Sequence, residues 1–163
     1  MGALCMELVR IYEMPDCKMV SSGIGMFGEE KFDNFFKWFT SLPKTVMVPH
    51  NFLSEDGGKL HWIQKYENGM DVPDEFSITD FKGGLYAVST DIDQKTDVDA
   101  MKKVTNDFLK QHGFEIDTSR AELGSIFTTQ KTYDVLGYNQ MDYYTPIKPK
   151  IFNSKGVNYA KRS

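Results

Sequence analysis

The feature that most constrains the fold of this chain is a pattern of two strands followed by an amphipathic helix, which occurs twice. In the first copy, residues 7–13 alternate polar and apolar side chains, and a second strand is expected over 18–24. The segment 28–43 predicts a helix, because its phenylalanines recur at i, i+3, i+4 and i+7: Phe32, Phe35, Phe36 and Phe39. Pro43 predicts where this helix ends, and the run 59–67 predicts the strand that completes the unit.

The second copy predicts strands at 75–81 and 85–92, a helix from about Asp97 to His112, and strands at 123–130 and 140–148. Thr96 is the expected cap of the helix and Gly113 its stop. The apolar stripe Met101, Val104 and Phe108 lies 69 residues beyond Phe32, Phe35 and Phe39. The turns that precede the second strands are offset by 67 residues, which takes Met14 onto Phe81. These matched positions favour an internal duplication over chance similarity.

The expected fold class is therefore α+β, with two pseudo-twofold-related strand–helix–strand units forming an antiparallel sheet. The units span about 7–67 and 75–149, in one domain over 1–149. Residues 150–163 lack periodicity and are expected to form a flexible tail.

The composition indicates an ordinary soluble globular protein, with 163 residues, 40% hydrophobic and 26% charged. The net charge of −4 gives no positive field that would attract nucleic acid or an anionic membrane. The sequence has no apolar run of the roughly 20 residues that span a bilayer, and no secretion signal. Cys5 and Cys17 make no disulfide framework, so we expect a cytoplasmic protein with reduced thiols.

Common catalytic motifs do not occur in the chain. The glycines of 23–28 lack the Lys-Ser/Thr of a phosphate-binding loop, and no Gly-x-Ser-x-Gly elbow exists. His50, His61 and His112 have no metal-ligand spacing, so neither a metal nor a cofactor is expected.

Two segments carry a family resemblance. VPDEFSITDFKGGLYAVS (72–89) resembles the central signature of GyrI-like (gyrase-inhibitor-like) effector-binding domains, and QMDYYTPIK (140–148) resembles their last strand. The resemblance covers about residues 7–149. It implies an SHS2-type duplicated fold whose sheet and two helices enclose a groove for small hydrophobic molecules, often aromatic or cationic.

Members of this bacterial family occur alone, or behind a helix-turn-helix domain in AraC- and MerR-type transcription activators, where multidrug binding is sensed. No helix-turn-helix precedes residue 7, so the resemblance implies a free-standing drug-binding protein or the sensor domain of a larger regulator. The implied partners are a small-molecule ligand and either a regulator's DNA-binding domain or a second copy. Direct contact with nucleic acid or a membrane is not expected.

The last strand supplies the first candidate residues. Strand alternation places Asp142 and Tyr144 on one face, and Met141, Tyr143 and Thr145 on the other. A carboxylate that faces a pocket needs compensation, which a ligand cation can give. The alternative is a solvated or lysine-paired acid. Many family members have Glu where this chain has Asp142, which is one methylene shorter.

Aromatic side chains supply the remaining candidates. Trp62, Gln64 and Tyr66 share a face of the strand 59–67, where rings could stack on a ligand or hold a cation. Alternatively, Trp62 packs under a helix. The list is completed by Tyr86, from its family position, by Phe127, which core packing also explains, and by Trp38, which lies off the phenylalanine stripe and is expected to face the groove between the helices. Glu122 is a second acid, by default solvated.

The leading hypothesis is a module that binds small amphipathic or cationic aromatic molecules. The alternative is a hydrolase that opens strained cyclopropane rings, with Asp142 as general base and Tyr144 polarising the leaving side. A protein-interaction or inhibitor module is the third hypothesis. The sequence leaves enzymatic activity undecided.

Overall fold

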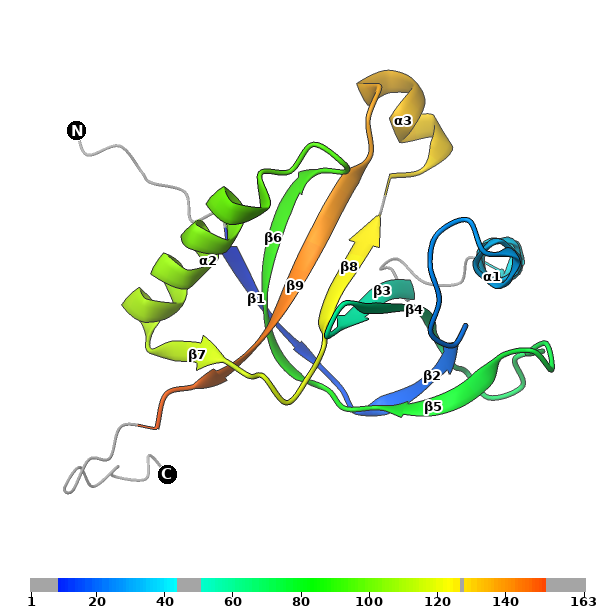
Figure 1. The fold of residues 1–163 in the computed structure, drawn as a ribbon, viewed down its shortest axis with the longest axis horizontal. Coiled ribbons are helices and arrows are strands. Elements are labelled where there is room, and N and C mark those ends of the chain that lie inside the picture. The colour runs from blue at the N-terminus through cyan, green and yellow to red at the C-terminus, as the bar shows by residue number, and fades with distance from the viewer. Residues whose placement is uncertain (1–8, 44–50, 127, 152–163) are drawn as a thin grey trace, which may run out of the picture.

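The computed structural model describes residues 9–43, 51–126 and 128–151, and it shows an α+β fold (Figure 1). The first unit contains β1 (Val9–Met14), β2 (Cys17–Ser21), α1 (Glu30–Ser41), β3 (Asn51–Asp56) and β4 (Lys59–Lys65). The second contains β5 (Ser77–Phe81), β6 (Gly84–Ile92), α2 (Val98–His112), β7 (Phe114–Ile116), β8 (Glu122–Ile126), α3 (Gln130–Leu136) and β9 (Gln140–Pro149). The predicted strands and long helices are confirmed, with ends shifted by a few residues.

The strands form one antiparallel sheet in the order β1-β6-β9-β8-β3-β4-β2-β5, while β7 pairs with the end of β9. The order reads the same from either end when the strands of one unit are exchanged for their counterparts in the other. β3 and β8 meet at the centre, where Leu53 lies opposite Gly124. The predicted pseudo-twofold arrangement is therefore confirmed. Each unit also lends its first strand to the other, because β1 pairs with β6 and β5 pairs with β2.

The two long helices, α1 and α2, cover the same face of the sheet, hereafter the helix face. Residues directly opposite each other on neighbouring strands share a face, and the register connects Trp62, under α1, through Leu53, Gly124 and Tyr143 to Ser89, under α2. Figure 1 shows the two helices over opposite halves of a strongly bent sheet.

The opposite face, hereafter the concave face, carries a second core that needs no helix. Its buried cluster draws residues from both units: Met19, Phe52, Ile63, Tyr86, Val88, Leu123 and Tyr144. The bend brings the two halves of this face together, so that side chains of one half exclude water from those of the other.

The helices follow the predicted stripes with two corrections. In α1, Phe32 and Phe35 are buried, but the predicted Phe36 is 50% exposed, although its ring lies 5.8 Å from that of Trp62. The helix ends at Ser41, before Pro43. In α2 the predicted Val104 is exposed, and Thr105 and Leu109 take the buried positions instead. Hydrophobicity alone misplaced the stripe, because Thr105 meets a polar partner under the helix, the hydroxyl of Ser89 at 3.1 Å.

The cap of α2 also differs from the expectation. The side chain of Asp97, rather than that of Thr96, accepts a hydrogen bond from the Ala100 N–H, whereas Thr96 donates to the carbonyl of Ile92. Gly113 ends the helix in the left-handed conformation, with φ of 76°, as predicted.

Three elements were not predicted: β3, β7 and α3. The segment 51–58 reads as a loop because of Gly57 and Gly58, yet these glycines form the tight connection of a β3–β4 hairpin, both with positive φ. The predicted turns at 14–16 and 82–84 are not hairpin turns, since the strands on either side of each turn pair elsewhere.

The two connections cross side by side. The Asp16 side chain accepts a hydrogen bond of 2.8 Å from the Gly83 N–H, and a Cβ on Gly83 would lie 2.1 Å from the Met14 carbonyl oxygen. Only glycine fits this approach of two backbones. Residues 152–163, most of the expected tail, lie outside the described residues.

Candidate functional site

Strand β9 distributes its side chains as predicted. Asp142 and Tyr144 are buried on the concave face, and Tyr143 and Thr145 lie on the helix face. β9 is held on both sides, by β6 and by β8, so its side chains project from the middle of the second half of the sheet. The position of Asp142 is therefore fixed by two ladders of backbone hydrogen bonds.

Asp142 is nearly enclosed, with 7% of its surface exposed. Its Oδ2 lies 3.2 Å from Nη2 of Arg10 on β1, and its Oδ1 accepts a short hydrogen bond from the hydroxyl of Thr90 on β6. Arg10 Nη2 is also 3.3 Å from the Thr90 hydroxyl. A buried carboxylate is thus balanced by one guanidinium and one hydroxyl, which satisfies the desolvation requirement. The alternative expectation was that Asp142 is solvated or paired with a lysine. Asp142 is paired with a basic side chain, but that side chain is the arginine Arg10.

Rings surround the next residue of the concave face, Tyr144. Its centroid lies 5.4 Å from that of Phe52, 6.3 Å from that of Tyr86 and 6.4 Å from that of Tyr12. Burial, followed by the negative charge of Asp142, raises the pKa of Tyr144 above its ordinary value. The phenol therefore stays protonated through the physiological range and can donate a hydrogen bond.

Tyr86 is fully buried on the same face and lies beneath a second arginine. The Cζ of Arg120 stands 4.7 Å from the ring centroid of Tyr86. Burial raises the pKa of Tyr86, while the neighbouring guanidinium opposes that shift. Tyr86 therefore supports the ring of Tyr144 from behind and is itself held in place by Arg120.

Trp62 lies on the helix face, across the sheet from Asp142. Four phenylalanine rings surround it at centroid distances of 5.4 to 6.0 Å: Phe27, Phe32, Phe36 and Phe39. The expectation that Trp62 packs under a helix is the one that matches this geometry. The structure does not bring Trp62 together with Asp142 and Tyr144.

Tyr66 and Trp38 also belong to the core beneath α1. Trp38 packs on Phe35 and Phe76, and its Nε1 donates to the carbonyl of Asp71 at 3.0 Å. Phe76 precedes the edge strand β5, so Trp38 lies toward that edge rather than toward α2. Phe127 lies outside the described residues.

A small cavity of about 170 Å³ opens on the helix face between α2 and the strands β8 and β9. Its lining includes Met101, Lys102, Thr105, Glu122 and Tyr143. The Tyr143 hydroxyl lies 3.0 Å from that of Thr96, so its hydrogen-bonding capacity is already engaged. Glu122 is exposed, which agrees with the expectation that it is a solvated acid.

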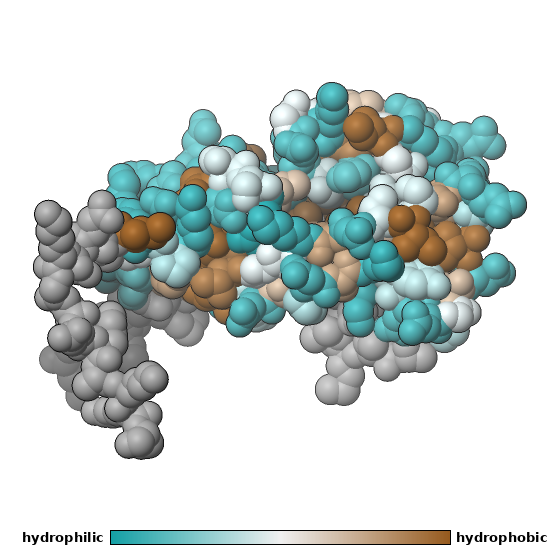
Figure 2. Space-filling view, turned by 90° about the horizontal axis from the view of Figure 1, so that it is seen from below, coloured by the Kyte–Doolittle hydropathy of each residue, from teal (hydrophilic) through white to brown (hydrophobic). Residues whose placement is uncertain are grey.

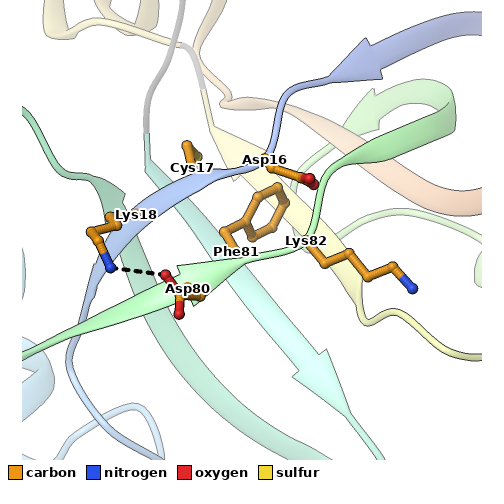
Figure 3. A pocket seen from close by; sticks show the side chains of 6 residues that line it. All are labelled: Asp16, Cys17, Lys18, Asp80, Phe81 and Lys82. Atoms are coloured by element: carbon orange, nitrogen blue, oxygen red, sulfur yellow. Dashed lines mark hydrogen bonds and ion pairs between the residues drawn. The ribbon is translucent and has the colours of Figure 1, made fainter.

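A larger, shallow depression of about 490 Å³ lies where β2 and β5 leave the crossing connections (Figure 3). Asp16, Cys17, Lys18, Asp80, Phe81 and Lys82 line it. Lys18 and Asp80 reach across it at 2.9 Å and neutralise each other. Burial raises the pKa of the Cys17 thiol, which favours the unreactive protonated form. The depression is open to solvent and has no enclosing wall.

Sequence reasoning missed Arg10, Tyr12 and Thr90. All three face Asp142 or Tyr144 only because β1 and β6 pair next to β9, a non-local arrangement. A signal did exist in the strand 7–13, where Val9 and Ile11 alternate with Arg10 and Tyr12. The apolar pair faces α2, which sends the polar pair to the concave face.

Two further findings concern metal binding and membrane-spanning helices in the described part of the chain. No group of three or more His, Cys, Asp or Glu side chains there is arranged to hold a metal ion. Among the same residues, none of the helices combines the length and the apolar character needed to cross a membrane. On the face shown in Figure 2, hydrophobic side chains surface in several separate groups between hydrophilic ones.

No family model and no curated protein matches the sequence, but solved structures share the fold. The EcmrR C-terminal domain aligns with a TM-score of 0.59 at 6% identity, over 86% of this chain and 97% of that one. A hydrolase from Listeria innocua aligns with a TM-score of 0.63 at 8% identity, over 87% of this chain and 92% of that one. SAV2435 bound to tetraphenylphosphonium gives 0.50 at 11% identity, over 86% and 93%.

Identities this low show likeness of fold alone. The alignments nevertheless cover most of this chain and nearly all of each neighbour, so they concern the whole duplicated architecture and not one unit. Together with the signatures at 72–89 and 140–148, they place this chain among proteins with the GyrI-like fold.

Proposed function

We propose that this chain binds small cationic aromatic molecules at Asp142. The observation that carries the proposal is the nearly enclosed carboxylate of Asp142, which lies beside Tyr144 and whose ion-pair partner, Arg10, is itself half-exposed. A charge costs free energy when it leaves water, and a site retains it where a counter-charge can be bound. A ligand cation is such a counter-charge.

The accessible side of this site is the one formed by β1. Tyr12 is 42% exposed there, and it lies between solvent and Tyr144. A ligand that arrives from this side would meet the Tyr12 ring first and then the carboxylate of Asp142. Aromatic rings and an acid together favour an organic cation over a metal ion, since the rings offer π faces and dispersion contacts.

The fold likeness and the family resemblance support the same proposal. SAV2435, which shares the fold, was solved with tetraphenylphosphonium, a cation enclosed by four rings. The family further suggests an effector-sensing module of a transcription regulator, or a free-standing drug-binding protein. In a regulator, the ligand would act only through a difference in affinity for two states.

Calorimetric titration with tetraphenylphosphonium tests the proposal. We expect Asp142→Asn to weaken binding at least about tenfold, because a desolvated charge pair is lost while the side-chain shape is kept. Glu122→Gln removes an exposed acid from the helix face and serves as the matched control, with a change of no more than about twofold. Equal affinity of the wild type and Asp142→Asn would contradict the proposal.

A second function is favoured by one observation, the position of Tyr144 beside Asp142 on the concave face. The protonated phenol could polarise the leaving side of a strained ring through a hydrogen bond while Asp142 activates water as general base. Incubation with a cyclopropane-bearing electrophile tests this alternative. Turnover that disappears in both Asp142→Asn and Tyr144→Phe supports a hydrolase, whereas binding without turnover supports the binding module alone.

A further inference from the structure

Arg10 reproduces the contacts expected of a bound organic cation. Its Nη2 pairs with Asp142 Oδ2 at 3.2 Å, its Nη1 donates to the Tyr12 hydroxyl at 3.1 Å, and its Cζ lies 5.3 Å from the centroid of that ring. An acid, a hydroxyl and an aromatic ring thus converge on one positive group. The chain itself supplies that group from the neighbouring strand.

Arg10 and Arg120 differ in the exposure of their side chains and in the kind of hydrogen-bond partner that each one has. Arg120 is 5% exposed and donates to three backbone carbonyls, those of Gly83, Leu85 and Ile147. Arg10 is 50% exposed, and its three hydrogen-bond partners are all side chains. Arg120 is therefore a fixed part of the fold, whereas Arg10 can exchange its partners for water by rotation of its own side chain.

The position of β1 lowers the free-energy cost of releasing the Arg10 guanidinium from its partners into water. β1 lies at the end of the strand order and pairs with β6, so Arg10 projects from an edge strand that borders solvent. Release of the guanidinium breaks no backbone hydrogen bond. The cost falls on Asp142, which would lose its charged partner in a nearly enclosed position.

We infer that Arg10 is a resident competitor for the Asp142 site and determines which ligands enter it. The inference rests on the proposed function. A molecule that carries a permanent positive charge and rings replaces the guanidinium at Asp142 and stacks on Tyr12. A neutral molecule of the same shape has no charge to offer, so it cannot compensate Asp142 and the Arg10–Asp142 pair stays closed. Arg10 is thus a specificity-determining residue for organic cations.

Competition between Arg10 and the ligand for Asp142 lowers the measured affinity for the ligand. When only a fraction of molecules has the site open, the apparent dissociation constant rises by the inverse of that fraction. An ion pair with a half-exposed guanidinium and a nearly enclosed carboxylate corresponds to at least about a fivefold bias toward the closed state. Removal of the like charge from the entrance adds to the gain, so we expect Arg10→Met to bind tetraphenylphosphonium about five- to tenfold more tightly than the wild type.

The experiment compares tetraphenylphosphonium with triphenylphosphine oxide, a neutral analogue, by calorimetry on the full chain. Arg10→Gln accompanies Arg10→Met, because glutamine removes the charge but can still donate to Asp142 and Thr90 if the apolar variant folds poorly. Lys18→Met removes an exposed cation elsewhere and is the matched control. We expect tighter cation binding in both Arg10 variants, an unchanged neutral ligand, and no effect of Lys18→Met.

The outcomes separate this inference from the proposed function. If Asp142→Asn weakens cation binding while both Arg10 variants bind like the wild type or more weakly, the competition is refuted and the binding function stands. If Lys18→Met gives the same gain as the Arg10 variants, the effect is one of net charge, which also refutes the inference. If no variant binds the cation, both proposals fail.

Discussion

Removal of the Arg120 guanidinium should destabilise the fold more than any other single change among the charged residues discussed above. Arg120 lies in the connection between β7 and β8. Its Nε donates to Asp117 at 2.9 Å, and its Nη atoms donate to the carbonyls of Leu85 at 2.8 Å, Ile147 at 2.9 Å and Gly83 at 3.3 Å. These partners belong to the β5–β6 connection, to β6, to β9 and to the β7–β8 connection itself, so one side chain ties together segments that are distant in sequence.

The magnitude follows from burial. Arg120→Met keeps an apolar stem but leaves three carbonyls and one carboxylate without their donor, in a place where the arginine was 5% exposed. Loss of one member of a buried charged network costs about 3–5 kcal/mol of unfolding free energy. With a urea dependence of about 2 kcal/mol per molar, the unfolding midpoint should fall by about 1.5–2.5 M. Arg120→Lys keeps the charge without the planar fork, so we expect about half of this loss.

Urea unfolding, followed by tryptophan fluorescence and by circular dichroism, measures the effect. Lys18→Met serves as the control, since its ion pair with Asp80 is exposed, and we expect a change within about 0.5 kcal/mol. A loss below about 1 kcal/mol for Arg120→Met, with an unchanged slope, would show that the carbonyls find water instead and would refute the reasoning.

Three further predictions concern neighbouring groups. Gly84→Ala should cost about 1–3 kcal/mol in urea unfolding, because φ is 135° and a Cβ would stand 2.7 Å from Arg120 Nη1; an unaffected midpoint would contradict this. Hydrogen bonds from Ser119 and Arg120 lower the pKa of Asp117, so its stabilising contribution is complete above about pH 5 and is lost as the pH falls further. Between about pH 5 and pH 2 the wild type should therefore lose more stability than Asp117→Asn, and parallel curves would contradict this. The raised pKa of Tyr144 predicts that ultraviolet titrations of the folded wild type and of Tyr144→Phe coincide up to about pH 11, and a difference near pH 10 would contradict it.

Local periodicity was sufficient for most of the secondary structure. The phenylalanine stripe of α1 and the alternation of β9 each depend on side chains within one element, and both appear as predicted except that Phe36 is half-exposed. The buried stripe of α2 was predicted at the wrong positions. Its buried Thr105 forms a hydrogen bond with the hydroxyl of Ser89 on β6, and no local pattern reveals this partner. β3 was not predicted, because Gly57 and Gly58, which connect β3 to β4, were interpreted as part of a longer loop.

The candidate site was predictable only in part, for the same reason. Asp142 and Tyr144 lie together because they are two residues apart on one strand. Arg10 and Thr90, which balance the carboxylate, come from strands 132 and 52 residues away in sequence. Trp62 was expected near the same pocket, but the face of β4 on which it lies could be assigned only once the register between the two units was known.

The exchange of first strands has a consequence for what one unit could form by itself. A polypeptide that carried one unit alone would leave the outer edge of its β2- or β6-like strand open, because the strand that fills this edge always comes from the other copy. Two such polypeptides could close both edges only by trading strands with each other. Two separate units of this architecture would therefore close their edges as an intertwined homodimer, whereas here the exchanged strands belong to one chain.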